Sequence, residues 1–110
     1  MDSRAAFRVE SAAMIETYLL RGLAEIERTG SFTAAAKALF VSQPALSRAM
    51  QKLEGELGVA LFDRSGGRTS LAPLGRLAAE HARAVLAALD GMAAAVNEPV
   101  RSISASPRSR

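Results

Sequence analysis

The sequence contains no cysteine and no tryptophan, and its 110 residues include only one tyrosine and four phenylalanines. Without cysteine the chain can form neither a disulfide framework nor a thiolate metal site, and it is compatible with a reducing compartment. Hydrophobic residues make up 49% of the chain, but 23 of them are alanine. This composition favours closely packed helices over a β-sandwich. The length suits one compact domain with an appendage.

Long apolar runs are also missing. The longest charge-free stretch, residues 38–47, covers ten residues and includes Pro44, so it is too short and too polar to span a membrane. Charged residues precede any apolar run at the N-terminus, which therefore lacks the form of a secretory signal. These features predict a cytoplasmic protein with no membrane partner.

Charge is distributed unevenly along a chain whose formal net charge is +3. Residues 31–76 carry six basic and three acidic side chains, and residues 99–110 carry three arginines and no acid. The remaining segments are slightly acidic. The positive charge is thus concentrated in one central segment and one tail.

Apolar spacing and helix start signals predict three helices. Residues 15–26 show the three-and-four spacing of an amphipathic helix, which Gly30 ends. A second helix over 31–40 and a third over 42–58 each begin at a serine that can cap free backbone amides. A short alanine-rich helix joined to an amphipathic helix across a few residues is typical of a helix-turn-helix.

One face of the third helix carries side chains suited to contacting DNA. Glutamine and serine hydrogen-bond base edges, arginine grips guanine bidentately, and lysine pairs with phosphate. On periodicity alone, an ordinary solvated face is the commoner explanation of such a pattern. No acid precedes Glu54 on this face, which consists of Gln43, Ser47, Arg48, Gln51 and Lys52.

A short hairpin is predicted after the third helix. Residues 59–64 and 68–71 flank Ser65-Gly66-Gly67, a typical turn sequence. Two strands that follow a helix-turn-helix form a wing. Arg64 at its base and Arg68 near its tip are placed to reach a DNA backbone or minor groove, with solvated hairpin charges as the equally good alternative.

Three runs of residues resemble the LysR-type bacterial transcriptional regulators. They are GSFTAAA at 30–36, LFVSQPALSR at 39–48 and LGVALFDR at 57–64, with Leu53-Glu54 between the last two. The resemblance extends over about residues 15–97. It implies a mainly α fold: a winged helix-turn-helix of three helices and a short two-stranded wing, followed by a long dimerisation or linker helix. In such a fold the recognition helix enters the major groove and the wing touches the minor groove.

The resemblance also implies which residues contact DNA. Those at or near base edges are Ser42, Gln43, Pro44, Ser47 and Arg48. The phosphate contacts are Thr33 and Lys52, and the wing contacts are Arg64 and Arg68.

The family pattern and the composition together divide the chain into four parts. We expect a flexible extension over 1–13, the DNA-binding domain over 14–72, a linker helix over 73–97, and a disordered basic tail or severed hinge over 98–110. Such a tail would add nonspecific attraction to DNA. Proteins of this family normally continue into an effector-binding domain, which is absent from this chain, so no effector is assigned.

Three residues depart from the family pattern. Ala72 stands where a threonine usually caps the linker helix, Phe40 stands where histidine is common, and Leu23 stands where an aromatic residue is usual. The last two are expected to be packing adjustments that leave the DNA-reading face unchanged.

Residues 73–97 predict a helix about 37 Å long, which needs a partner. Its apolar residues alternate spacings of four and three, as in a coiled-coil seam. We expect the N-terminal half to pack on its own domain and the C-terminal half on a second subunit. The resulting homodimer would bind an inverted-repeat operator, with half-sites about one helical turn or a multiple apart. The seam begins at Ala78, and its predicted dimer contacts are Ala82, Val85, Leu89, Met92 and Val96.

No enzymatic or metal-binding constellation is present in the sequence. It has no glycine-rich phosphate loop and no plausible Ser, His and Asp arrangement, so we predict no enzyme, no cofactor and no metal site. His81, the only histidine, is expected at the surface or an interface.

The main hypothesis is therefore a sequence-specific transcriptional regulator, or its isolated DNA-binding part, that binds double-stranded DNA. One alternative is a short interaction module that dimerises with a full-length regulator and modulates it. Another is the N-terminal domain of a molybdate-responsive regulator, whose winged helix is similar. The run at residues 42–48 favours the LysR-type interpretation over the second alternative.

Overall fold

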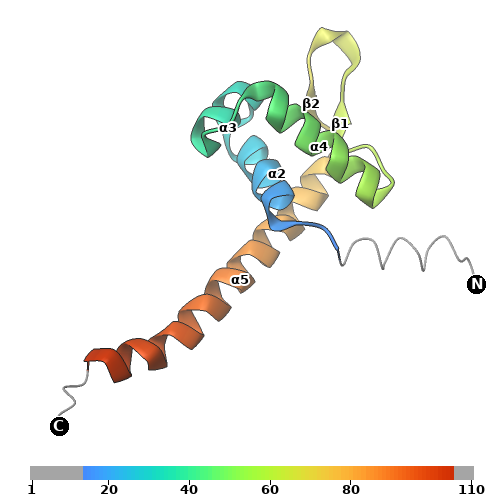
Figure 1. The fold of residues 1–110 in the computed structure, drawn as a ribbon. Helices are drawn as coiled ribbons and strands as arrows, with labels where there is room; N and C mark the ends of the chain where they lie inside the picture. The colour runs from blue at the N-terminus through green and yellow to red at the C-terminus, as the bar shows by residue number, and fades with distance from the viewer. Residues whose placement is uncertain (1–13, 106–110) are drawn as a thin grey trace, which may run out of the picture.

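The structure, a computed structural model, describes residues 14–105. Figure 1 shows three helices grouped into a compact body, a hairpin beside the last of them, and a fourth helix that extends away from the body. The predicted mainly α winged helix-turn-helix with a long terminal helix is confirmed. In chain order the elements are α2 (Thr17–Thr29), α3 (Phe32–Leu39), α4 (Gln43–Leu57), β1 (Phe62–Asp63), the 3-10 turn η1 (Ser65–Gly67), β2 (Ser70–Leu71) and α5 (Pro73–Ala105).

The ends of the first three helices follow the predicted signals. The hydroxyls of Ser31 and Ser42 each accept a hydrogen bond from the backbone N–H three residues on, at 3.0 and 3.1 Å. Gly30 and Gly58 end α2 and α4 in the left-handed conformation, with φ of 70° and 74°, which glycine adopts without steric cost. Only the start of α2 is later than predicted, at Thr17, because the preceding residue keeps an extended backbone.

The turn between α3 and α4 contains Phe40, whose side chain lies where the sequence did not predict it. Phe40 ends α3 in the left-handed conformation, with φ of 59°, and its side chain is 95% exposed. The expectation that Phe40 is a packing adjustment is therefore wrong, because the conformation that ends α3 leaves its ring outside the core. Leu23, by contrast, is 1% exposed and lies in the core.

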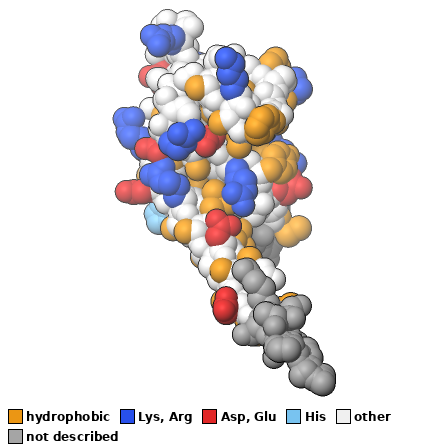
Figure 2. All heavy atoms as spheres, turned by 90° about the vertical axis from the view of Figure 1, so that its left-hand side faces the viewer, with side chains coloured by type: hydrophobic (Ala, Val, Ile, Leu, Met, Phe, Trp, Pro, Cys, Tyr) orange, Lys and Arg blue, Asp and Glu red, His pale blue; other side chains and the backbone are white. Residues whose placement is uncertain are grey.

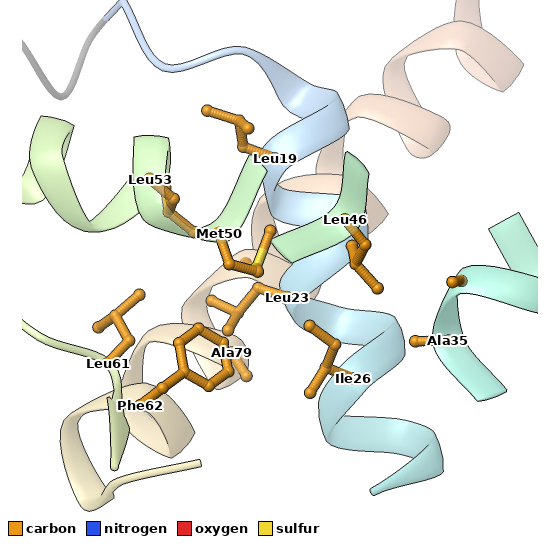
Figure 3. Close-up of a cluster of buried hydrophobic side chains, with 12 residues drawn as sticks. Leu19, Leu23, Ile26, Ala35, Leu46, Met50, Leu53, Leu61, Phe62 and Ala79 are labelled. Carbon is orange, nitrogen blue, oxygen red and sulfur yellow. The ribbon is translucent and has the colours of Figure 1, made fainter. Parts of the chain in front are cut away.

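The core is built around α2 (Figure 3). Buried side chains converge on this helix from α4, from the residues around β1, and from the first half of α5. The rings of Phe32 and Phe62 meet edge to face, with centroids 5.2 Å apart. Each buried leucine matters for stability, since truncation of such a side chain to alanine typically costs about 2–5 kcal/mol. The fully buried large side chains are Leu19, Leu23, Met50, Leu53 and Leu61.

The first part of α5 is fixed to the body of the domain. Ala79, Ala82 and Leu86 are buried, at 0%, 2% and 8% exposure. A hydrogen-bonded ion pair between Glu27 of α2 and Arg83 of α5 adds a polar contact on the same helix pair. Ala82 was predicted to contact a second subunit. This prediction is wrong, because Ala82 packs into the core of its own chain.

The far end of α5 is longer than predicted. The helix was expected to end at Asn97, with a disordered tail from residue 98, but it continues through Pro99 to Ala105. A proline inside a helix removes one backbone hydrogen bond and crowds the carbonyl four residues earlier. The helix nevertheless continues through Pro99, after three alanines at 93–95 that favour helix strongly. Residues 1–13 and 106–110, which hold the predicted extension and the rest of the tail, lie outside the described residues.

Candidate nucleic-acid interface

The outer face of α4 presents polar and basic side chains to solvent. Gln43, Pro44 and Arg48 are exposed, as is the capping residue Ser42, whereas Ser47 is half-buried. Among the described side chains no ion pair involves Arg48. Its guanidinium is therefore available for a bidentate contact to a partner outside the chain.

The first turns of α3 and α4 meet at a side-chain hydrogen bond. The hydroxyl of Thr33, in the first turn of α3, donates to Oε1 of Gln43, the first residue of α4, at 2.9 Å. Both side chains are exposed. The two residues were predicted as separate DNA contacts, to phosphate and to a base, and no sequence pattern indicates that they touch.

Lys52 lies further along the same helix and has an acidic partner. Its Nζ is 3.3 Å from Oε1 of Glu16, which precedes α2, and both side chains are at least half exposed. The hydrogen bond that Lys52 donates to Glu16 raises the pKa of Lys52. The ammonium has three N–H donors, so Lys52 can contact a phosphate with or without Glu16, and the exposed ion pair itself contributes little to stability.

The wing is a two-stranded antiparallel hairpin in which Phe62 pairs with Leu71 and Asp63 with Ser70. Its tip turns through Gly66 and Gly67, both with φ near 75°, a conformation that favours glycine. The carboxylate of Asp63 accepts hydrogen bonds from the backbone N–H and the hydroxyl of Ser65, and these bonds lower the pKa of Asp63. Arg68, predicted near the tip, is exposed.

Glu54 fastens the wing to α4. Its Oε2 accepts hydrogen bonds from the backbone N–H groups of Leu61 and Phe62, at 2.7 and 3.2 Å. Its Oε1 pairs with Nη2 of Arg64 at 3.1 Å. The side chain of Glu54 is only 14% exposed, and that of Arg64 is 43% exposed. Arg64, predicted as a DNA contact, thus anchors the hairpin to α4. The sequence clue to Glu54 is that it is the first acid on an otherwise acid-free face.

Two opposing effects set the pKa of Glu54. Burial acts to raise it, but the hydrogen bonds from Leu61, Arg64 and Phe62 outweigh burial and hold the pKa below its ordinary value. A carboxyl whose pKa is lowered by folding stabilises the folded state above the pKa of the unfolded chain, about 4.3 for glutamate. That contribution is lost as the pH falls through the lower, folded pKa.

We therefore expect Glu54→Gln to destabilise the domain at neutral pH by about 1–3 kcal/mol, since it removes the charge from several hydrogen bonds. The difference from the parent protein should shrink as the pH falls below about 4, where Glu54 itself becomes protonated. Urea unfolding at a series of pH values measures both effects. A Glu56→Gln control, on an acid that makes no ion pair among the described side chains, should change little. If the free energies of unfolding of the parent protein and Glu54→Gln differ by the same amount at all pH values, the carboxylate of Glu54 does not stabilise the wing as described.

The predicted DNA contacts lie on or next to three elements, namely α3, α4 and the wing. Figure 1 shows α4 and the wing at the end of the body away from the far part of α5. On the face shown in Figure 2, Lys and Arg side chains spread over the body, with acidic and hydrophobic side chains between them. The structure thus brings α3, α4 and the wing together, and it separates them from the exposed part of α5.

From Val85 onward, α5 carries an apolar stripe that no other element covers among the residues the structure describes. Met92 and Val96 are each 60% exposed and Val85 is 45% exposed, whereas Leu89 is half-buried. Val100, one turn further, is also 60% exposed. Figure 2 shows hydrophobic side chains continuing from the body onto this helix. Because Ala82 belongs to the core, the predicted dimer contacts are reduced to Val85, Leu89, Met92 and Val96.

Other kinds of site are not seen in the described part of the chain. His81 is exposed, and residues 14–100 contain no group of three or more potential metal ligands. Among the helices described, none is both long enough and apolar enough to cross a membrane.

Comparison with known proteins places the body of the domain in a family. Residues 18–76 match the family described as bacterial regulatory helix-turn-helix protein, lysR family. The chain is 52% identical over 71 residues to the probable HTH-type transcriptional regulator YhaJ of Escherichia coli, which covers 64% of this chain and 24% of that protein. A probable hydrogen peroxide-inducible genes activator of Mycobacterium xenopi is 47% identical over 76 residues, 69% of this chain and 40% of that protein. The chain therefore spans well under half of these relatives.

Solved structures with the same fold include proteins of this kind. A complex of BenM_DBD with benA site 1 DNA matches with a TM-score of 0.72 and 32% identity, over 78% of this chain and 97% of that one. Full-length BenM, as its R156H mutant, matches with a TM-score of 0.70 and 33% identity, over 76% of this chain and 28% of that one. The family match covers more than half of the chain, and it falls on the helix-turn-helix and wing described above. This chain belongs to the LysR family of bacterial regulatory helix-turn-helix proteins and carries the family's DNA-binding regulator domain.

Proposed function

We propose that the chain recognises a specific sequence in double-stranded DNA as a homodimer, with α4 in the major groove and the wing at the minor groove. The observation that carries this proposal is the first half of α4, where exposed Gln43 and Arg48 stand on a face without acids. These side chains match the hydrogen-bonding pattern of base edges. The likeness to BenM_DBD, which was solved in complex with DNA, supports DNA binding.

The individual roles follow from chemistry and position. Gln43 and Arg48 read base edges, with Ser42, Pro44 and Ser47 in the same contact surface. Lys52 contacts phosphate, and Arg68 reaches the minor groove from the wing tip. Arg64 keeps its contact to Glu54 and fixes the wing while its exposed edge faces the DNA backbone.

Dimerisation is the second part of the proposal. The exposed stripe of Val85, Met92 and Val96 on α5 is the surface that pairs two subunits, with Leu89 at its edge. A two-fold axis would then place two copies of α4 on an inverted repeat. The same stripe also supports the alternative in which the chain binds a full-length regulator. DNase footprinting of the purified protein separates the two, since a pure interaction module leaves no protected site.

Arg48→Ala is expected to reduce discrimination between the operator and random DNA by about 10- to 100-fold, because a bidentate base contact contributes about 1–3 kcal/mol of specificity. Lys52→Ala should weaken binding to both DNAs alike. It should also reduce by about one the steepness with which the logarithm of the binding constant falls with the logarithm of the salt concentration. Both side chains are exposed, so folding should be unaffected. Fluorescence anisotropy over a salt series measures these quantities, on an operator first obtained by selection from a random DNA pool.

Arg48→Lys is the matched control, since it keeps the charge and loses the fork of donors. It should retain affinity for random DNA and still lose discrimination. If Arg48→Ala lowers affinity for operator and random DNA equally, Arg48 does not read a base.

A further inference from the structure

We propose that Thr33 is a positioning residue that sets the base preference of Gln43, rather than only a phosphate contact. The proposal rests on the proposed function, because it concerns how the DNA-reading face chooses a base. It begins from the one side-chain hydrogen bond that joins α3 to α4, from the Thr33 hydroxyl to Oε1 of Gln43 at 2.9 Å.

The direction of this hydrogen bond limits what Thr33 can do. An amide oxygen only accepts, so the hydroxyl must donate, and a threonine hydroxyl has a single hydrogen. While that hydrogen is held by Gln43, Thr33 cannot donate it to a phosphate oxygen. A donated bond to phosphate and the bond to Gln43 are therefore mutually exclusive.

Electrostatics explains why the oxygen of the Gln43 amide faces inward. Thr33 lies in the first turn of α3, and Gln43 is the first residue of α4. Backbone N–H groups and the positive ends of two helix dipoles therefore surround this point. A carbonyl oxygen is favoured there over an amino group. The NH₂ group of Gln43 is then left to face outward, on the exposed side of α4.

An outward NH₂ group determines which bases Gln43 can read. It donates to acceptors in the major groove, which are N7 and O6 of guanine, N7 of adenine and O4 of thymine. It does not pair with the N4 amino group of cytosine, which is itself a donor. If the amide could turn over freely, its oxygen would accept from cytosine or adenine amino groups, and the preference would relax. Thr33 thus restricts Gln43 to positions that present an acceptor.

The test is selection of bound sequences from a random DNA pool with the full chain and four variants. The parent protein should exclude cytosine at the base that Gln43 reads by roughly tenfold, the discrimination of one good side-chain contact. Gln43→Ala should remove the preference at that base and so identify it. Thr33→Val, nearly isosteric but without a hydroxyl, should relax the preference at the same base and at no other. Thr33→Ser keeps the donor and should behave as the parent does.

Thr33→Asp provides a sharper variant, because a carboxylate only accepts. It should turn the Gln43 amide over and shift the preference at this base toward cytosine or adenine, although repulsion from phosphates weakens overall affinity. Circular dichroism of each variant checks that the helices form.

Two outcomes would overturn the assignment in different ways. If Thr33→Val weakens binding to all sequences equally and leaves every base preference unchanged, Thr33 is only a phosphate contact, and the proposed function still stands. If the parent protein enriches no sequence at all, the proposed function fails and this inference fails with it.

Discussion

Gly75→Ala is expected to destabilise the domain by at least about 3 kcal/mol, at the upper end for an overpacked core. Gly75 is buried in the first turn of α5, and a Cβ there would overlap the carbonyl oxygen of Leu61 and approach Leu71 Cδ1 to 2.7 Å. The Leu61 oxygen belongs to the backbone and is already held by the N–H of Ala72 at 2.9 Å. It cannot turn aside as a side chain would, so α5 has to move away from the wing.

Thermal and urea unfolding, followed by far-UV circular dichroism at several protein concentrations, measure this loss. The thermal midpoint should fall by roughly 12 °C or more, by the usual scaling for a domain of this size. Since the total stability of a small domain is only about 5–15 kcal/mol, partial unfolding near physiological temperature is expected.

Gly22→Ala is the matched control, because Gly22 is also a buried glycine within a helix. There the added Cβ would meet the ends of two side chains, Met50 Cε at 2.7 Å and Leu46 Cδ1 at 3.0 Å. A methionine end rotates away readily, and alanine gains about 1 kcal/mol over glycine in a helix interior. Gly22→Ala should therefore be close to neutral. Equal effects at the two glycines would show that α5 does not approach the Leu61 carbonyl as described.

Met92→Asp is expected to convert the proposed dimer to a monomer. The Met92 side chain is 60% exposed on the α5 stripe, and a two-fold axis would bring two copies of the new carboxylate into one apolar interface. Loss of the second subunit should lower affinity for an operator with two half-sites by at least about 100-fold, the size of a typical avidity effect. Affinity for a single half-site should not change. Analytical ultracentrifugation and DNA titration measure the two effects separately.

Ala94→Asp tests whether the position of the charge matters rather than its presence. Ala94 lies two residues further along α5, about 200° around the helix from Met92, and is also exposed. This variant should remain a dimer with parental affinity. If Met92→Asp sediments as a dimer, the subunits pair through another surface.

The helices were predictable because their signals are local. Ser31 and Ser42 act on amides three residues away, and Gly30 and Gly58 act through their own backbone angles. The wing was predictable for the same reason, from the Gly66-Gly67 turn, although its strands proved shorter than expected.

The contacts between elements were not predictable in the same way. The hydrogen bonds from the wing to Glu54 and from Thr33 to Gln43 join residues seven to ten positions apart, and whether these residues meet depends on how the helices pack. Ala82 was assigned to the wrong partner because a stripe with spacings of three and four looks the same whether it packs on α2 or on a second copy. Only the position of α2 in space decides which part of the stripe is already covered.

The attachment of α5 to α2 has a mechanical consequence. Burial of Leu86 and the Glu27–Arg83 pair hold the near part of α5 against the body, whereas the side chains described beyond it are largely exposed. The 19 residues from Ala87 to Ala105 form an arm about 29 Å long, so a tilt of about 10° at its root displaces its tip by about 5 Å. If the arms of two copies are clasped together, a tilt at their roots would move the two bodies, and with them the two α4 helices, relative to each other.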